Sequence, residues 1–201
     1  MSMIKNFTDI AFTESVKQLQ EENGSRRSYS RMDGMEVNEL HISEIQFIAD
    51  RDMFYMATVG ENGWPYVQYR GGPKGFLKVL SPTQIAFADF RGNRQYISTG
   101  NLKDTKKAAL ILMDYSTRSR LKIWVETEII SASDNPLYEK LVTADYPAKV
   151  ERFIVMNVKA YDWNCPQHIT QRFTLDQYTE LLANGNLKLD EALLKKLSKT
   201  N

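Results

Sequence analysis

The sequence predicts a mainly β fold, an antiparallel barrel of six or seven strands with peripheral helices. Two observations support this fold class. From Met53 onwards, short apolar or alternating runs follow one another, separated by turns rich in Gly, Pro, Asn and Ser. Helical patterns gather mainly before residue 51 and after residue 173. Strands joined by short turns and flanked by a few helices are typical of a closed or nearly closed antiparallel barrel.

The expected strands are bounded by recognisable turns. Glu61-Asn62-Gly63 has the composition of a hairpin turn, with Gly at the position of positive φ. A Gly-rich stretch at 71–75 separates the second expected strand from the third. In the sixth strand, Leu121 and Ile123 alternate onto one face. The expected strands cover residues 53–59, 64–70, 76–80, 84–90, 108–113, 121–133 and 152–163.

The expected helices have capping residues at their starts. Thr13 can cap a helix that ends at residue 22, and Thr174 with Gln177 has the spacing of a capping box. Cation-rich runs such as residues 25–31 usually form solvent-exposed turns. The alternative is that this run binds an anionic ligand or partner. The expected helices cover 14–22, 43–49, 93–101, 135–143 and 174–184, with another amphipathic helix at 189–197.

The chain of 201 residues is long enough for one compact domain with terminal additions. We expect an N-terminal helical arm over residues 1–50 that packs on the barrel. The barrel itself is expected over 51–173 and C-terminal helices over 174–201. The apolar faces of the C-terminal helices are expected to pack in a core or between subunits.

Composition excludes several classes of function. The net charge of +1 gives no reason to expect nucleic acid, and no apolar run is long enough to span a membrane. A single cysteine, Cys165, excludes an intrachain disulfide and a multi-cysteine metal site. No signal peptide pattern is visible, so the cytoplasm is the expected location. No hydrolase motif occurs, and an enzyme of this composition would need a cofactor.

The stretch from Gln84 to Leu102 predicts an anion site. It reads as a strand, a turn at Arg91-Gly92 and a helix that Asn93 caps, with Arg94 in the first turn. Helix N–H groups and a guanidinium both bind phosphate. A cation at a helix N-terminus is otherwise unfavourable, because it opposes the helix dipole. A surface arginine without a ligand stays an alternative.

Three segments together carry a family resemblance. They are Gly63-Trp64-Pro65-Tyr66-Val67-Gln68-Tyr69-Arg70-Gly71-Gly72-Pro73, Phe87-Ala88-Asp89-Phe90-Arg91-Gly92-Asn93-Arg94-Gln95-Tyr96 and Tyr161-Asp162-Trp163-Asn164-Cys165-Pro166-Gln167-His168-Ile169-Thr170-Gln171-Arg172-Phe173. In this order they resemble the FMN-binding split-barrel family of pyridoxamine 5'-phosphate oxidase. The likeness covers about residues 10–175 and is greatest to an oxidase-related branch with a Trp-Asn-Cys-Pro-Gln-His-Ile signature.

The resemblance implies a six-stranded split barrel and a homodimer with two FMN molecules at the subunit interface. By position, it implies flavin contacts from four segments of this chain, the third of them reaching the cofactor from the partner subunit. These implied contacts are Gln68, Tyr69, Arg70 and Gly71; Ala88, Asp89, Asn93, Arg94 and Gln95; Arg120 and Lys122; and Trp163 and Arg172. The residues Asn93, Arg94 and Gln95 would hold the phosphate.

The implied function is that of an FMN-dependent oxidoreductase acting on an unidentified small molecule. Cys165 and His168 are candidate proton donors or polarising groups near the flavin, and packing roles are the alternative. A non-catalytic FMN carrier, sensor or electron-transfer module is the alternative function. A wide cavity lined by Arg26, Arg27, Tyr29 or Arg172 would favour the enzyme. Haem or deazaflavin on the same barrel is less favoured than FMN.

Overall fold

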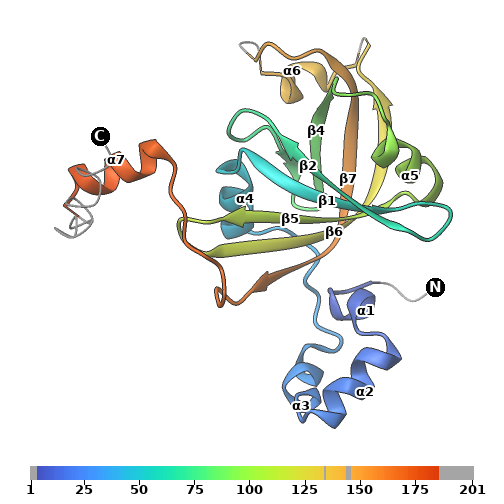
Figure 1. The fold of residues 1–201 in the computed structure, drawn as a ribbon. Helices are drawn as coiled ribbons and strands as arrows, with labels where there is room; N and C mark the ends of the chain where they lie inside the picture. The colour runs from blue at the N-terminus through green and yellow to red at the C-terminus, as the bar shows by residue number, and fades with distance from the viewer. Residues whose placement is uncertain (1–3, 134, 144–145, 186–201) are drawn as a thin grey trace.

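Seven antiparallel strands form one sheet in the computed structural model, which describes residues 4–133, 135–143 and 146–185. The order across the sheet is β2-β1-β5-β6-β7-β4-β3, and the sheet curls into an open barrel (Figure 1). The strands are β1 (Met53–Val59), β2 (Pro65–Gly71), β3 (Lys78–Ser81), β4 (Gln84–Phe90), β5 (Lys107–Asp114), β6 (Ser119–Ser131) and β7 (Val150–Asn164). The mainly β antiparallel fold is confirmed. The seven strands lie within the expected six or seven, one more than the family resemblance implies.

Alternation along the strands builds two cores. The inner side of the barrel holds Phe54, Phe87 and Ile123, each at most 1% exposed. On the other side of β4, Ala86 and Ala88 pack with Phe153 in a smaller cluster under α6 (Tyr138–Leu141). Odd and even residues of β4 therefore point to opposite sides of the sheet, and both faces of this strand are buried.

Side chains, rather than paired strands, connect the two edges of the sheet across the barrel opening. β2 and β3 are the edge strands, so they have no neighbour on one side. Arg70 of β2 reaches Asp89 of β4, with 2.6 Å between guanidinium and carboxylate. Helix α5 (Ile97–Thr105) packs on β1, β2 and β6 nearby. The bridge therefore brings β2 close to β4, which are five places apart in the sheet order.

The other helices are α1 (Thr8–Ala11), α2 (Glu14–Glu22), α3 (Arg26–Tyr29), α4 (Ile42–Ala49) and α7 (Leu175–Ala183), with a 3-10 turn at Ser30–Met32. The caps at Thr13 and Thr174 are confirmed, because each hydroxyl accepts a backbone N–H three residues later. The cationic run folds as α3 rather than as a turn. The helix expected at 135–143 shrinks to α6, and the one expected at 189–197 lies outside the described residues. No described helix has the length and apolar character needed to span a bilayer.

The N-terminal helices α1, α2 and α3 form a group beside the barrel, with α1 nearest to it (Figure 1). The ring of Phe7 stacks on Trp124 of β6 at 5.9 Å. Asn6, fully buried, donates hydrogen bonds to the carbonyls of Met32 and Met35 and so joins the two ends of the group. This group therefore contacts the barrel at a corner of the β6 surface.

Helix α4 is attached to the end of β7 by Glu44. Its carboxylate accepts hydrogen bonds from the backbone N–H of His41 (3.0 Å) and from the indole N–H of Trp163 (2.6 Å). The ring of Trp163 also packs edge-on against Phe47 at 4.8 Å. Burial by itself raises the pKa of Glu44, but the hydrogen bonds from Trp163, Ser43 and His41 outweigh it and lower the pKa below its ordinary value.

The substitution Glu44→Gln is expected to lower the free energy of unfolding by about 1–2 kcal/mol at pH 7, since hydrogen bonds to a charged acceptor are lost. A lowered folded-state pKa stabilises the fold above the ordinary carboxyl pKa, and this contribution disappears as pH falls through the folded value. The difference between the two proteins should therefore shrink below about pH 4. Urea unfolding across this range measures it, and an equal difference at pH 7 and pH 3 would contradict the assignment.

Candidate functional site

Two arginines and an aspartate form the centre of a polar cluster at the β2–β4 bridge. Asp89 is 5% exposed and lies between Arg70, at 2.6 Å, and Arg152 of β7, at 3.5 Å. Arg152 also pairs with the neighbouring Glu151. Burial raises the pKa of Asp89 above its ordinary value, against the opposing attraction of Arg70 and Arg152. We call Arg70, Asp89 and Arg152 the arginine cluster.

The start of helix α5 joins this cluster. The hydroxyl of Ser98 donates to the side-chain oxygen of Gln68 at 2.8 Å, and Arg152 donates to the hydroxyl of Thr99 at 3.3 Å. The guanidinium of Arg152 also lies over the ring of Tyr96, 5.0 Å from its centre. The first N–H groups of a helix have no partner within the helix and carry partial positive charge. The cluster and the helix start together form a region suited to an anion.

The loop before α5 differs from the prediction. The helix begins at Ile97 rather than after Asn93, and it continues to Thr105, beyond the expected end at residue 101. The side chain of Asn93 accepts from the backbone N–H of Gln95 at 3.1 Å and so closes a turn instead of capping the helix. Arg94 and Tyr96 have left-handed backbone conformations, with φ of 61° and 55°. The side chains of residues 93–95 are exposed in this loop, next to the start of α5.

The opposite side of the same strands is apolar and exposed. In β2, Val67 and Tyr69 are 61% and 57% exposed, whereas Gln68 and Arg70 face α5 and the cluster. The strand register places Val67 beside Ala57, and Ala57 beside Ala109. A shallow hollow of about 160 Å³ lies on this surface. We call this surface the outer face; it consists of Tyr55, Ala57, Val67, Tyr69, Ala109, Ile111, Lys122 and Trp124.

The remaining predicted contacts lie at the far end of β6 and β7. Arg120 pairs in register with Asn164, and Lys122 with Asp162. Trp163 lies eleven residues after Arg152 on the same strand, a separation along the strand of roughly 36 Å at the usual rise. One copy of the chain therefore does not bring Arg120, Lys122 and Trp163 to the arginine cluster. Gly71 is the last residue of β2, directly after Arg70, and Tyr69 lies on the outer face.

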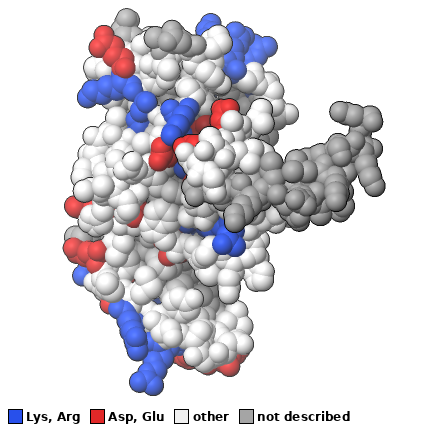
Figure 2. All heavy atoms as spheres, turned by 90° about the vertical axis from the view of Figure 1, so that its left-hand side faces the viewer, with Lys and Arg blue, Asp and Glu red and all other residues white. Residues whose placement is uncertain are grey.

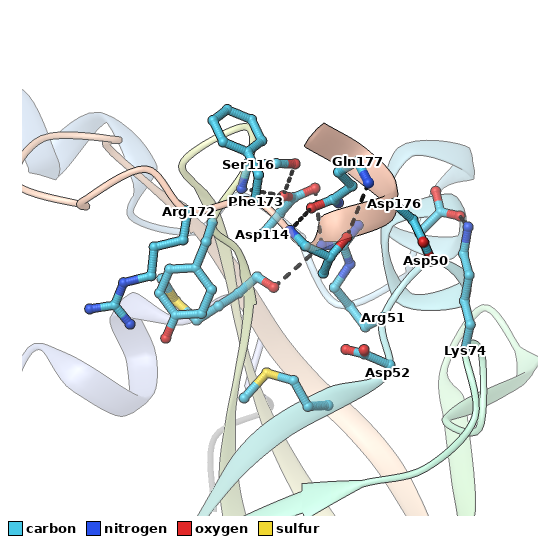
Figure 3. A pocket seen from close by; sticks show the side chains of 14 residues that line it. Asp50, Arg51, Asp52, Lys74, Asp114, Ser116, Arg172, Phe173, Asp176 and Gln177 are labelled. Carbon is cyan, nitrogen blue, oxygen red and sulfur yellow. Dashed lines mark hydrogen bonds and ion pairs between the residues drawn. The ribbon is translucent and has the colours of Figure 1, made fainter. Parts of the chain in front are cut away.

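A cavity of about 700 Å³ opens between the start of β1, the β5–β6 turn and the start of α7 (Figure 3). Arg172 stands at one side of it and the ion pair of Lys74 with Asp50 at the other. Arg172 lies over the ring of Tyr115 at 5.2 Å, and Arg51 pairs with Asp114 at 3.0 Å. The cavity is lined by Asp50, Arg51, Asp52, Met53, Lys74, Met113, Asp114, Tyr115, Ser116, Arg172, Phe173, Thr174, Asp176 and Gln177.

Charge on the face that carries this region is mixed. Figure 2 shows acidic and basic side chains scattered among uncharged ones there.

The candidate catalytic residues Cys165 and His168 are both exposed in the segment that follows β7, and His168 has a φ of 63°. Among the described residues, no three His, Cys, Asp or Glu side chains gather in a group that could hold a metal ion.

The structure thus unites Gln68, Arg70 and Asp89 around the start of α5. Ala88 is 2% exposed and packs in the smaller core. Its packing fixes the backbone next to Asp89. Sequence reasoning missed Arg152 and Ser98. The only signal for Arg152 was a cation directly before the apolar run Phe153–Met156, and its nearness to β4 follows from strand pairing that no local pattern encodes.

Comparison with known proteins supports one family. A family model described as "Pyridoxamine 5'-phosphate oxidase" matches residues 44–164. HupZ of group A Streptococcus is similar in structure, with 14% identity, a TM-score of 0.50 and coverage of 67% of this chain and 100% of that one. At this identity the likeness shows a shared fold. No curated protein matches the chain.

Two further solved structures are similar at lower TM-scores. A candidate pyridoxamine 5'-phosphate oxidase from Lactobacillus delbrueckii has 19% identity and a TM-score of 0.49, and the match covers 63% of this chain and 95% of that one. An FMN-binding protein from Syntrophomonas wolfei has 16% identity and a TM-score of 0.46, with 76% and 96% covered.

Proposed function

Because this chain belongs to the pyridoxamine 5'-phosphate oxidase family, we propose that it is a flavoprotein that binds FMN and serves as an oxidoreductase for a small molecule. The observation that carries the proposal is the arginine cluster at the start of α5. Two guanidinium groups, a helix N-terminus and the loop cation Arg94 lie around one region. Guanidinium groups and the N–H groups of a helix start both bind phosphate groups.

The residues present fit a phosphate-bearing cofactor. Arg70 donates to Asp89 through one nitrogen, while its Nε is buried and has no hydrogen-bond partner among the described residues. A guanidinium has five N–H donors, so Arg70 can keep Asp89 and still donate to an anion. Arg94 is exposed beside the helix start and makes no ion pair with a described residue. We assign Arg70, Arg94 and the first N–H groups of α5 to the phosphate.

A homodimer accounts for the separation of the predicted contacts. Within one copy, Arg120 and Lys122 stand far along β6 from the arginine cluster. Lys122 belongs to the exposed apolar outer face, and large exposed apolar patches mark interaction sites. If two copies pack through their outer faces, each brings Arg120 and Lys122 toward the cluster of the other. We therefore propose two FMN sites per dimer, each built from both chains.

Val67→Glu is expected to convert the dimer to a monomer and to weaken FMN binding at least tenfold. The side chain is 61% exposed in one copy, so the fold tolerates a carboxylate, whereas burying this charge in an apolar interface is costly. Light scattering after gel filtration measures the mass. Leu19→Glu on α2, 57% exposed, is the matched control and should stay dimeric. A dimeric Val67→Glu protein with full FMN affinity would refute the shared interface.

FMN supplies reversible acceptance of a hydride or of single electrons when it is bound. The protein's own residues then bind and orient the small molecule and supply protons to it. The cavity with Arg172 is wide enough for a small molecule and supports an enzyme over a passive carrier. Arg26, Arg27 and Tyr29 do not line it. Cys165 and His168, exposed near Arg172 in sequence, remain the proposed proton donors.

One experiment separates the oxidoreductase from a non-catalytic carrier, sensor or electron-transfer module. The FMN-loaded protein is mixed anaerobically with NADH or NADPH, and the flavin absorbance is followed. Loss of the visible flavin bands at a rate above that of free FMN supports the oxidoreductase. Unchanged bands with both donors, in a protein that holds FMN tightly, favour the module.

A further inference from the structure

Two buried polar atoms without hydrogen-bond partners belong to residues that are paired across β6 and β7. Arg120 and Asn164 are directly paired in the strand register, so their side chains lie on the same face of the sheet. The Nε of Arg120 and the Oδ1 of Asn164 are both buried, and neither has a hydrogen-bond partner among the described residues. Buried polar atoms of this kind are rare in folded proteins and require an explanation.

The orientation of the Asn164 amide is fixed by its neighbour. Its Nδ2 donates to the carboxylate of Asp162 at 2.8 Å. Asp162 stands beside Lys122 in the register, and burial raises its pKa while Lys122 opposes the shift. A carboxylate oxygen holds the NH2 end of the amide, so the carbonyl end is the free one. The unpartnered pair is therefore one donor, Arg120 Nε, beside one acceptor, Asn164 Oδ1.

The backbone beneath Asn164 is held firmly. The preceding residue, Trp163, points to the opposite side of β7, where its indole N–H donates to Glu44 and its ring packs on Phe47. Arg120 donates no side-chain hydrogen bond to a described residue, so a rotation of this side chain that uncovers both atoms breaks none. The position of the acceptor is thus set by the fold, and access to it depends on one long side chain.

We propose that Arg120 and Asn164 bind the imide edge of the flavin held by the second copy of the chain. This assignment rests on the proposed FMN dimer and adds Asn164 to it. The pyrimidine part of the flavin ring presents carbonyl oxygens on both sides of the N3–H group. Arg120 Nε donates to a carbonyl oxygen, and Asn164 Oδ1 accepts from N3–H. A single donor beside a single acceptor matches such an edge and discriminates against a ring that lacks the N–H.

The test compares binding of FMN with binding of 3-methyl-FMN, in which a methyl group replaces the N3 hydrogen. Fluorescence titration gives both dissociation constants. Wild-type protein should bind FMN about tenfold more tightly than 3-methyl-FMN, because one buried hydrogen bond is lost. Asn164→Ala should bind FMN about five- to tenfold more weakly and should reduce the discrimination to within about twofold. Asn164→Asp, which keeps an acceptor oxygen, should retain the discrimination.

Asn157→Ala is the matched control, because it removes an asparagine from the other half of β7 and should leave both constants unchanged. Discrimination that persists in Asn164→Ala would overturn the assignment while the FMN site stands. If the wild-type dimer bound FMN and 3-methyl-FMN equally, the assignment would fail in the same way. Absence of FMN binding in the wild-type protein would overturn the proposed function and this assignment together.

Discussion

Phe87→Ala is expected to lower the free energy of unfolding by about 3–5 kcal/mol, because it leaves a large cavity in the barrel. Phe87 is 1% exposed and its ring contacts those of Phe54 and Phe76, with centres 5.3 and 6.3 Å away. The guanidinium of Arg70 also lies 5.8 Å from the ring centre. The substitution should therefore loosen the arginine cluster as well as the core. Urea unfolding monitored by circular dichroism measures the loss.

The control for this core substitution is Phe173→Ala, which removes a ring that is 37% exposed. It should cost less than about 1 kcal/mol, as surface changes usually do. A second comparison is Phe87→Leu, which keeps most of the apolar volume and should cost less than Phe87→Ala. Equal losses for Phe87→Ala and Phe173→Ala would show that this aromatic cluster is not the centre of the core.

Arg94→Ala is expected to weaken FMN binding about 10- to 100-fold. A hydrogen bond between a guanidinium and a phosphate contributes about 1.5–3 kcal/mol, and each 1.4 kcal/mol is a factor of ten in affinity. Arg94 is exposed, so its removal should leave the free energy of unfolding within about 0.5 kcal/mol. Riboflavin, which has no phosphate, should bind the variant and the wild-type protein equally. Fluorescence titrations with the two flavins measure both effects.

Arg27→Ala is the control for loss of a cation, because Arg27 is exposed on α3, within the N-terminal helices. It should bind FMN like the wild-type protein. Full FMN affinity in Arg94→Ala would remove the loop from the phosphate site. An equal loss of riboflavin and FMN affinity would instead place Arg94 against the ring or the ribityl chain.

Strands were predictable because each one carries its own signal. β1 and β4 lie at the residues expected, and the hairpin turn before β2 has Gly63 at a φ of 82°. In β6, Leu121 and Ile123 alternate to the inside as expected, and both are fully buried. A period of two and a glycine that must adopt positive φ are local properties, so a single sequence displays them.

The start of α5 was not predictable from the same kind of signal. Asn93 suits both a helix cap and an isolated turn, because its side chain accepts a backbone N–H in either case. In the structure it closes the turn, and the helix begins only after Tyr96, a residue type that seldom adopts the left-handed conformation found there. The packing of Ser98 and Thr99 against Gln68 and Arg152 accompanies this later start.

One chain brings together only some of the predicted site residues, and the reason is physical. Motifs record which residues contact a ligand and not which copy of the chain supplies them. Gln68, Arg70 and Asp89 converge because β2 and β4 meet across the barrel opening. Arg120 and Trp163 stand at the other end of long strands, and Trp163 already donates its N–H to Glu44. Arg152 joins the cluster through the pairing of β7 with β4, which is a long-range contact.

The most direct measurement is a titration of the purified wild-type protein with FMN, combined with light scattering. The proposed site predicts a flavin absorbance spectrum shifted from that of free FMN, with saturation at about one FMN per chain. It also predicts a particle with the mass of two chains. A protein that stays colourless and leaves added FMN free in solution at micromolar concentrations would contradict the central claim.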